Sequence, residues 1–369
     1  MSMPFPDEES GVSFEKVAGV DVIRNFGSPR DEYEAAVNRV AVRFRGHRAQ
    51  WRFEGRQPVE MLSGVVTGVM PEPLQEVEPG VLAGKATYHT VLTPKGKIVA
   101  DLRLWRRDEG DGVHLRADLS HGAAPALAEL LSRTLPPRLV KRVDLGDATG
   151  MLTVLGPEAS RLLSATVLGL RVDQSDLDEL EEGELRMLAD SGGDQLLVIR
   201  NGDLSVPAFD VVGHRDVLRS AWRHLTQGGA ARVGRDSWDV LRVEAGRPDY
   251  LTELADEIIP VEAGIHDRAI DYDKGCYTGQ EVIVRIRDRG RVNRSLRRLR
   301  LDIDAPLPEA GTELFRERDR PVGHLTSVAD SPREGKLALA YVRREVEAGQ
   351  TVHVGGLDGP RARVEELEV

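Results

Sequence analysis

The sequence contains very little cysteine, which limits the chemistry available to it. Its one cysteine, Cys276, cannot form an intrachain disulfide, and one chain cannot build a cysteine-ligated zinc or iron–sulfur site from it. The 9 histidines are scattered without a metal-ligand spacing, so no metal site is expected. A reducing compartment, the cytoplasm, is the expected location.

Long apolar runs are also missing. No segment has the roughly 20 apolar residues that a membrane-spanning helix needs, so no membrane association is expected. The first ten residues are acidic and contain proline, unlike a secretory signal peptide. With 40% hydrophobic and 30% charged residues, the composition is globular, and 369 residues favour more than one domain.

The net charge of -11 argues against a protein that binds nucleic acid over its whole surface. One segment is nevertheless strongly basic, with Asp288 as its one acid among the arginines Arg285, Arg287, Arg289, Arg291, Arg294, Arg297, Arg298 and Arg300. The alternation from Arg285 to Arg291 predicts a strand with guanidinium groups on one face. Such a face could attract an RNA backbone or a polyglutamylated folate, or it could be a solvated surface neutralised by the acidic excess. Aromatic residues of the kind that stack on single-stranded nucleic acid are not interleaved with it.

Two successive passages of the chain share one order of predicted elements, a strand and a helix followed by paired strands. The first has a helix opening at Asp31, a strand pair over 40–53, a helix over 58–66 and a hairpin over 85–105. The second runs from a strand at 151–155 to a helix at about 216–227. This order indicates paired α+β halves rather than alternating parallel βαβ units.

The C-terminal part contains short strand-like pieces separated by proline, glycine and aspartate turns. These pieces cover residues 296–303, 313–315, 322–327, 337–342 and 351–354. Because no long helix interrupts them, they predict a small antiparallel β-barrel or sandwich.

The densest group of reactive side chains is an eight-residue run. It consists of Lys274, Gly275, Cys276, Tyr277, Thr278, Gly279, Gln280 and Glu281. Its two glycines allow a tight backbone, and a predicted strand over 282–286 would hold the run at a sheet end. Cys276 could be a small buried hydrophobic residue. Lys274 and the nearby arginines instead favour a thiolate, so a reactive thiol is the hypothesis.

This run resembles the Lys-Gly-Cys-[Tyr/Phe]-x-Gly-Gln-Glu signature of the YgfZ-type folate-binding proteins. That family is related to the aminomethyltransferase of glycine cleavage, the T-protein, and supports iron–sulfur enzymes. Segments 95–101, 242–246 and 260–265 are similar to motifs of the wider T-protein superfamily. Together the matches cover about residues 85–290.

The resemblance implies an α+β, T-protein-like multidomain fold. Two βαββ-type halves would surround a central cavity, with an antiparallel β-barrel at the C-terminus. The expected division is an N-terminal arm over 1–30, a bipartite folate-binding region over 31–288 and the barrel over 289–369. Tetrahydrofolate is the implied cofactor.

Asp101 is the implied catalytic residue, together with Cys276, because Asp101 matches the carboxylate near folate N5 in true aminomethyltransferases. An ionised Asp101 would stabilise a cationic one-carbon group, and Lys95, Lys97 and Arg103 are expected to keep it ionised. Alternatively, Asp101 is a solvated strand residue paired with a lysine.

Three further residues are implied to bind the folate. Asp210 matches the glutamate that holds the pterin, whose amine and ring N–H form a donor pair suited to a carboxylate. It is shorter than glutamate, and Val206-Pro207-Ala208 replaces the expected Gly-Glu-x-Gly, so Asp210 could instead be an exposed strand residue. Arg242 could bind the glutamate tail bidentately or pair with Glu244 or Glu262. Glu262 lies in a matching segment and is the third candidate.

Three functions follow. The first is a tetrahydrofolate-binding protein that supports iron–sulfur cluster assembly or repair, with or without one-carbon transfer. The second is a true aminomethyltransferase that forms methylene-tetrahydrofolate. It is opposed by the Cys276 run and by Val69, where relatives carry aspartate after Thr67-Gly68. The third is a non-catalytic RNA-modification partner that uses the Arg285–Arg300 segment.

Overall fold

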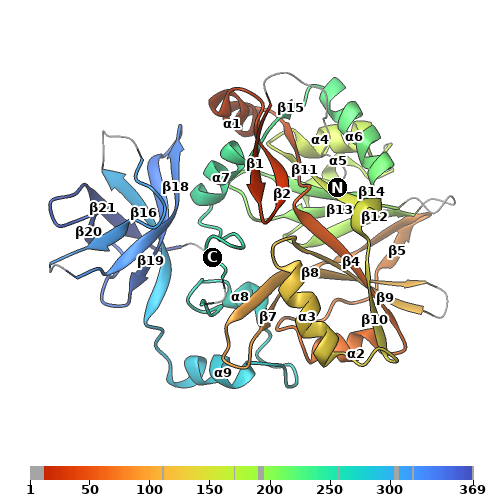
Figure 1. The fold of residues 1–369 in the computed structure, drawn as a ribbon. Coiled ribbons are helices and arrows are strands. Elements are labelled where there is room, and N and C mark those ends of the chain that lie inside the picture. The colour runs from red at the N-terminus through yellow and green to blue at the C-terminus, as the bar shows by residue number, and fades with distance from the viewer. Residues whose placement is uncertain are drawn as a thin grey trace.

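A computed structural model describes residues 12–109, 112–169, 171–189, 195–255, 257–302, 307–317 and 320–367. The chain forms two large sheets that make up the body of the molecule, and a barrel that stands beside them (Figure 1). The predicted α+β architecture, with two halves and a C-terminal antiparallel barrel, is therefore confirmed.

The first sheet is five-stranded and antiparallel. Its order is β10 (Val140–Asp144), β4 (Arg48–Gly55), β9 (Gly112–Ser120), β8 (Ile98–Glu109) and β7 (Thr87–Leu92). Helices α2 (Pro58–Ser63) and α3 (Ala124–Thr134) pack against it. Strands β7 and β8 form the hairpin predicted over 85–105.

The second sheet is eight-stranded. Its order is β15 (Ala231–Arg232), β3 (Ala41–Phe44), β11 (Thr149–Leu155), β14 (Ala208–His214), β13 (Gln195–Asn201), β12 (Glu184–Ala189), β6 (Val81–Lys85) and β5 (Gln75–Glu78). The helices of this half are α1 (Pro29–Asn38), α4 (Ala159–Thr166), α5 (Gln174–Asp178), α6 (Arg215–Gln227) and α7 (Arg235–Glu244). A hairpin of β1 (Ser13–Val17) and β2 (Val20–Asn25) precedes them.

The predicted strand pair over 40–53 is wrong in its pairing. Both strands exist, but β3 pairs with β11 in the second sheet and β4 pairs with β9 and β10 in the first. The turn at Arg45–His47 is where the chain passes from one sheet to the other. Alternation identifies a strand and its buried face, but it does not identify the neighbour.

Helix α1 begins earlier than the Asp31 cap predicted from the sequence. Ser28 is the N-cap, and its hydroxyl accepts the Asp31 amide at 3.3 Å. Pro29 occupies the first helical turn, where its fixed φ suits the helix and no amide is needed.

The barrel closes in the order β16 (Arg294–Asp302), β19 (Gly335–Arg343), β18 (Gly323–Ser331), β17 (Glu313–Phe315), β20 (Thr351–Val354) and β21 (Arg361–Glu365). Its interior is apolar and includes Leu299, Leu314, Leu325, Val352 and Val364. Strand β21 was not predicted, although it closes the barrel by pairing with β16.

The strand predicted over 282–286 is wrong, because these residues lie in helix α9 (Gln280–Arg289). Gly279 caps the helix with a φ of 84°, a left-handed conformation that favours glycine. Ile283 is buried, and Arg285 pairs with Glu281 one turn earlier at 2.9 Å. The arginines therefore do not form one strand face.

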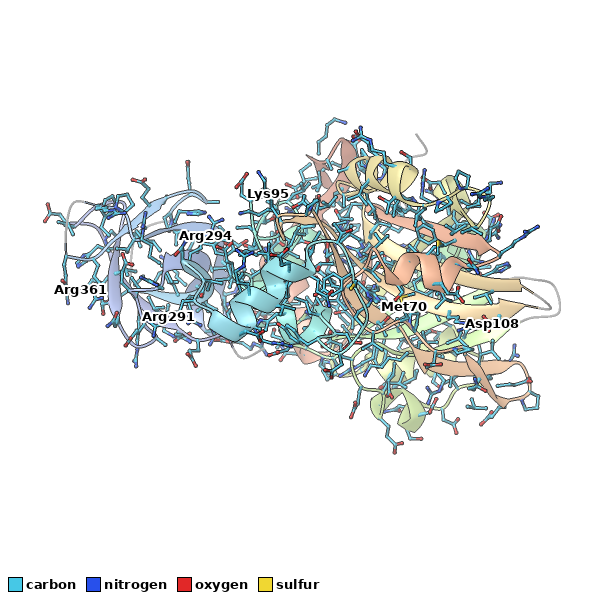
Figure 2. The ribbon with its side chains drawn as sticks, turned by 90° about the horizontal axis from the view of Figure 1, so that it is seen from below. Met70, Lys95, Asp108, Arg291, Arg294 and Arg361 are labelled. Atoms are coloured by element: carbon cyan, nitrogen blue, oxygen red, sulfur yellow. The ribbon has the colours of Figure 1, made fainter. Side chains whose placement is uncertain are left out.

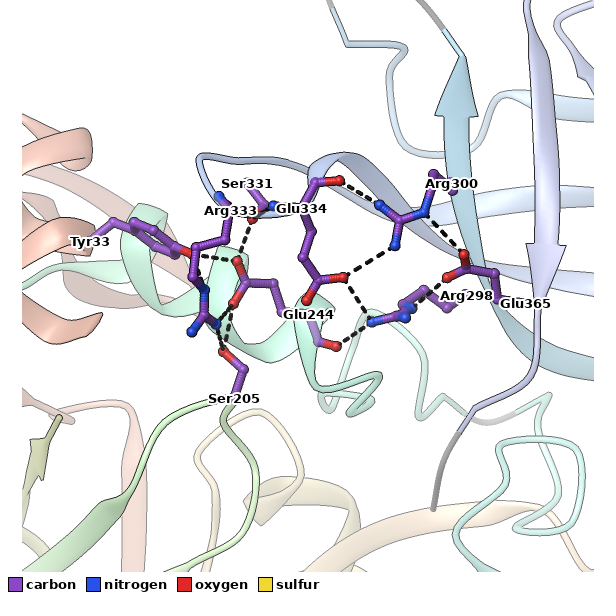
Figure 3. Close-up of polar contacts among 9 residues, drawn as sticks. All are labelled: Tyr33, Ser205, Glu244, Arg298, Arg300, Ser331, Arg333, Glu334 and Glu365. Atoms are coloured by element: carbon purple, nitrogen blue, oxygen red, sulfur yellow. Dashed lines mark hydrogen bonds and ion pairs between the residues drawn. The ribbon is translucent and has the colours of Figure 1, made fainter. Parts of the chain in front are cut away.

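A polar joint fixes the barrel to the body of the molecule (Figure 3). The Glu244 carboxylate, at the end of α7, accepts the Tyr33 hydroxyl at 2.5 Å and the Ser205 hydroxyl at 2.6 Å. From the barrel side it contacts Ser331 and Arg333. The joint is also apolar, because the core of the five-stranded sheet continues into barrel residues Leu296, Leu337, Leu339 and Tyr341.

Candidate functional site

A cavity of about 510 Å³ is bounded by residues from both sheets and the loops beside them. It is strongly charged. Its charged lining residues are Arg45, Arg48, Lys85, Asp101, Arg103, Glu182, Arg200, Asp203, Asp249, Asp267 and Arg268. This volume lies within the roughly 300–1,000 Å³ range of small-molecule sites.

The alternation of side chains along strand β8 places Asp101 on the face of the strand that lines this cavity. Asp101 and Arg103 line it, whereas Ala100, Leu102 and Leu104 belong to the hydrophobic core on the opposite face. Successive side chains of a strand point to opposite faces. The sequence Ala-Asp-Leu-Arg-Leu therefore puts its two charged residues on one face and its three apolar residues on the other.

Asp101 is only 9% exposed and incompletely bonded. The Tyr88 hydroxyl, from the neighbouring strand β7, donates to Asp101 Oδ2 at 3.0 Å. Asp101 Oδ1 has no hydrogen-bond partner among the described residues. Burial raises the pKa of Asp101, and the positive charge of Arg48 opposes that rise.

The cations predicted to keep Asp101 ionised are engaged elsewhere or remote from it. Lys97 Nζ lies 3.7 Å from the Glu257 carboxylate and also donates to the Glu257 carbonyl. Lys95 is exposed in the turn between β7 and β8. Arg103 pairs with two other carboxylates, described next.

Arg103 lies between two fully buried carboxylates at the inner wall of the cavity. Its Nη2 is 2.8 Å from Asp118 Oδ2, and its Nη1 is 2.7 Å from Asp210 Oδ2. Arg48 donates bidentately to Asp118 at 3.0 and 2.7 Å. Although burial alone would raise it, the pKa of Asp118 lies well below its usual range because Arg48 and Arg103 are adjacent.

Asp210 is therefore neither exposed nor open to the cavity. Besides the Arg103 contact, its Oδ1 accepts the Thr153 hydroxyl at 2.6 Å and its Oδ2 accepts the Asn201 amide at 2.9 Å. Arg45 Nη1 lies 3.5 Å from Oδ1. Asp210 has no exposed surface and does not line the cavity.

Arg242 and Glu262 lie at the barrel joint and do not line the cavity. Arg242 is buried, with Nη1 3.0 Å from Glu253 Oε2 and Nη2 donating to the Ser327 hydroxyl at 2.8 Å. Glu262 Oε1 lies 3.4 Å from Arg294 at the start of β16. These contacts connect α7, and the loops that follow it in the chain, to the barrel.

The run Lys274–Glu281 lies against one wall of the cavity. Lys274 Nζ donates to the carbonyls of Val66 and Gly68, both at 2.9 Å, and Gly68 lines the cavity. Burial lowers the pKa of Lys274 to about 8.

The rest of the run has separate positions. Cys276 and Gly275 are exposed, whereas Tyr277 is buried and its hydroxyl has no partner among the described residues. Gln280 and Glu281 form the first turn of α9. Lys274 thus supports the cavity wall, and the Cys276 thiol is accessible to solvent.

Several cavity residues were not identified from the sequence. Arg268, on α8 (His266–Ala269), lies 3.0 Å from Asp203 Oδ1 and over the Tyr88 ring at 4.9 Å. His89 does not line the cavity; it is fully buried, and its Nδ1 accepts the amide of the lining residue Gly68 at 3.1 Å. Tyr88 could have been found from alternation along the predicted hairpin. Arg268 and Asp203 come together only through the tertiary fold.

Within the parts of the chain that the structure describes, no group of three or more His, Cys, Asp or Glu side chains could hold a metal ion. No described helix is long and apolar enough to cross a membrane.

Comparison with known proteins identifies the family. The GCVT N-terminal domain matches residues 7–274, and the glycine cleavage T-protein C-terminal barrel domain matches residues 294–366. The aminomethyltransferase of Rubrobacter xylanophilus is 30% identical over 90% of this chain and 84% of its own. That of Corynebacterium jeikeium is 29% identical over 91% and 87%.

A solved structure has the same fold. The glycine cleavage system aminomethyltransferase T from Bartonella henselae superposes with a TM-score of 0.79, at 19% identity, over 97% of this chain and 94% of its own. With both family domains matched in order along the chain, the protein belongs to the glycine-cleavage T-protein family and is aminomethyltransferase-like.

Proposed function

We propose that this chain binds a reduced folate, tetrahydrofolate, in the cavity beside Asp101. The main support is the combination of family membership with one unsatisfied carboxylate oxygen. Asp101 lines the cavity, and its Oδ1 is buried without a partner among the described residues. An unpaired buried polar atom is costly, so a ligand that donates a hydrogen bond there would be favoured.

The residues around Asp101 suit such a ligand. A bound folate would supply the nitrogen that carries a one-carbon unit, and Asp101 would orient or stabilise the positive charge beside it. Tyr88 fixes one oxygen of the carboxylate and leaves the other free to face the ligand. Arg48 favours the ionised form, against the opposing effect of burial.

The test is equilibrium binding of tetrahydrofolate under anaerobic conditions to the intact chain. Saturable binding that is weakened at least tenfold in Asp101→Asn supports the proposal, since about 1.4 kcal/mol corresponds to a factor of ten. Asp108→Asn is the matched control, because Asp108 lies on the same strand but pairs with Arg106 at the surface. Absence of saturable binding by the unaltered protein would overturn the proposal.

Within the family, we propose that the chain belongs to the YgfZ-type branch and supports iron–sulfur enzymes. The run Lys274–Glu281 matches every fixed position of that branch's signature, and Cys276 presents an exposed thiol. The thiol would act on a client protein, since one cysteine cannot ligate a cluster alone.

Recovery of an oxidatively damaged iron–sulfur enzyme, measured with and without this protein, tests that assignment. Recovery that is lost in Cys276→Ala but kept in Asp108→Asn supports it. Formation of methylene-tetrahydrofolate from an aminomethyl donor, abolished in Asp101→Asn, would instead select a true aminomethyltransferase.

The Arg285–Arg300 segment gives little support to an RNA-modification role. Arg285, Arg287, Arg294, Arg298 and Arg300 all pair with carboxylates. Figure 2 shows Arg291 and Arg294 where the chain passes from α9 towards the barrel. RNA binding is therefore not part of the proposed function.

A further inference from the structure

The charged groups of the cavity divide into those that are neutralised within the protein and those that are not. Arg45, Arg48 and Arg103 are paired with Asp118 or Asp210, carboxylates that lie behind the cavity lining. Arg268, which also lines the cavity, pairs with Asp203 at 3.0 Å and with Glu182. Lys85 and Arg200 also line the cavity and take part in none of these pairs.

Two carboxylates of the lining have no cation in direct contact. Asp101 accepts one hydrogen bond, from Tyr88, and its Oδ1 is buried without a partner among the described residues. Asp249 is half-buried and lines the same cavity. Within the described chain, the Asp249 carboxylate accepts no hydrogen bond and forms no ion pair; its backbone amide donates to Glu253.

The position of Asp249 is held by its backbone. Its amide donates to Glu253 Oε2 at 3.0 Å, and its carbonyl accepts the amides of Glu253 and Leu254, both at 3.0 Å. The adjacent Tyr250 donates its hydroxyl to the carbonyl of Val99 at 2.9 Å. Since Val99 lies two residues before Asp101 on β8, these bonds fix the Asp249 segment against the strand that carries Asp101.

The negative charge of Asp249 acts on Asp101. Burial is the main cause of the raised pKa of Asp101, and the negative charge of Asp249 adds to it. Like charges in a partly desolvated site repel, and a ligand that brings positive charge or N–H donors relieves that repulsion. The part of the cavity lined by Asp101 and Asp249 therefore favours a ligand group with hydrogen-bond donors over an anionic group.

We propose that Asp249 is a ligand-binding carboxylate of this cavity and accepts the paired N–H donors of the pterin ring. This inference rests on the proposed binding of reduced folate. Asp210, the residue that the sequence motif favours, is fully buried and already bonded to Arg103, Thr153 and Asn201. Asp249 is exposed to the cavity and has both oxygens available, so it can accept a bidentate pair.

The test compares the binding of two folate fragments, tetrahydropterin and p-aminobenzoylglutamate, and of whole tetrahydrofolate. Asp249→Asn replaces one acceptor oxygen by a donor, which would face the donors of the ring. Tetrahydrofolate and tetrahydropterin should bind about 10- to 100-fold more weakly, the range expected for loss of a hydrogen bond to a charged group. Binding of p-aminobenzoylglutamate should change less than about twofold.

Asp108→Asn is the matched control. Asp108 lies on strand β8, outside the cavity lining, and pairs with Arg106 at 2.7 Å. This variant should bind tetrahydrofolate as the unaltered protein does. Because the Asp249 carboxylate forms no hydrogen bond or ion pair with the described residues, Asp249→Asn should also keep its melting temperature.

If Asp249→Asn does not fold, carboxyl ¹³C spectra of the unaltered protein decide the matter. Adding tetrahydropterin should shift the Asp249 signal, and an unmoved Asp249 signal would overturn the assignment. Unaltered binding of tetrahydrofolate by a folded Asp249→Asn protein would also overturn it, while leaving folate binding intact. Failure of the unaltered protein to bind tetrahydrofolate would instead overturn the proposed function and this inference together.

Discussion

Arg103 Nη1 lies 2.7 Å from Asp210 Oδ2, and this ion pair separates a residue that the motif marks as ligand-binding from the cavity. The same guanidinium also donates to Asp118, so one cation pairs with two carboxylates that have no exposed surface. Asp210 is therefore absent from the cavity lining, whereas Asp101 and Asp249 line it without an ion-pair partner among the described residues.

Arg103→Met should destabilise the fold strongly, because it leaves two buried carboxylates with less positive charge around them. Removal of one partner from a buried ion pair costs about 3–5 kcal/mol, and this is the expected loss in free energy of unfolding. Urea denaturation measures it. Arg106→Met is the control on the same strand, because its pair with Asp108 is at the surface and should cost less than about 1 kcal/mol. Equal losses in the two variants would contradict the buried-bridge interpretation.

His89 should make the stability depend on pH in the acid range. Its Nδ1 accepts the Gly68 amide, so the ring proton is on Nε2, next to the Thr87 hydroxyl at 2.7 Å. Burial lowers the pKa of His89 to about 3, from an ordinary value of 6.5. Between these values the unfolded chain binds the extra proton, so this contribution to stability is complete above about pH 6.5 and falls as the pH drops towards 3.

His89→Gln keeps an acceptor for Gly68 and a donor for Thr87 but cannot titrate. The decline in unfolding free energy from pH 6.5 to 3 should be shallower in this variant, as measured by urea unfolding at a series of pH values. His121→Gln changes an exposed histidine and should leave the profile unchanged. A His89→Gln profile that matches the unaltered protein would show that His89 is not buried in its neutral form.

Lys274→Met should loosen the cavity wall at residues 66–68. The substitution removes the two donors that satisfy the carbonyls of Val66 and Gly68, at an expected cost of about 1–3 kcal/mol. The Gly68 amide, which donates to His89, should exchange with solvent deuterium faster. Lys95→Met, in an exposed turn, should leave this exchange rate unchanged. Unchanged exchange in Lys274→Met would mean that the ammonium does not hold the wall.

Gly279→Ala should be poorly tolerated. The backbone has a φ of 84°, and an added Cβ would lie 2.6 Å from the carbonyl oxygen of Thr93. A strained left-handed residue costs about 1–3 kcal/mol, before the clash is relieved by movement of the chain. Gly275→Ala, four residues earlier, meets nothing within 4 Å and should have a much smaller effect. Thermal unfolding of both variants would show the difference, and comparable melting temperatures would contradict it.

Much of the architecture followed from the sequence alone. The sequence over 85–105 predicted the β7–β8 hairpin, and in the fold Asp101 and Arg103 on its second strand both line the cavity. The short C-terminal strands predicted the barrel, and the run Lys274–Glu281 with its companion motifs indicated the family. These features depend on residues that are close in the chain, where side-chain period, turn chemistry and motif spacing operate directly.

Which side chains contact one another depends on the tertiary structure. The motif predicted that Asp210 binds the pterin; in the fold, Asp210 is fully buried and pairs with Arg103 from the other sheet. The resemblance also predicted that Arg242 binds folate; in the fold, Arg242 donates to Glu253 and to a barrel serine, Ser327. Asp249, which belongs to no motif, reaches the cavity because Tyr250 is fixed to β8. Local pattern determines the face on which a side chain lies, whereas its charge partner comes from a distant segment that only the folded chain brings near.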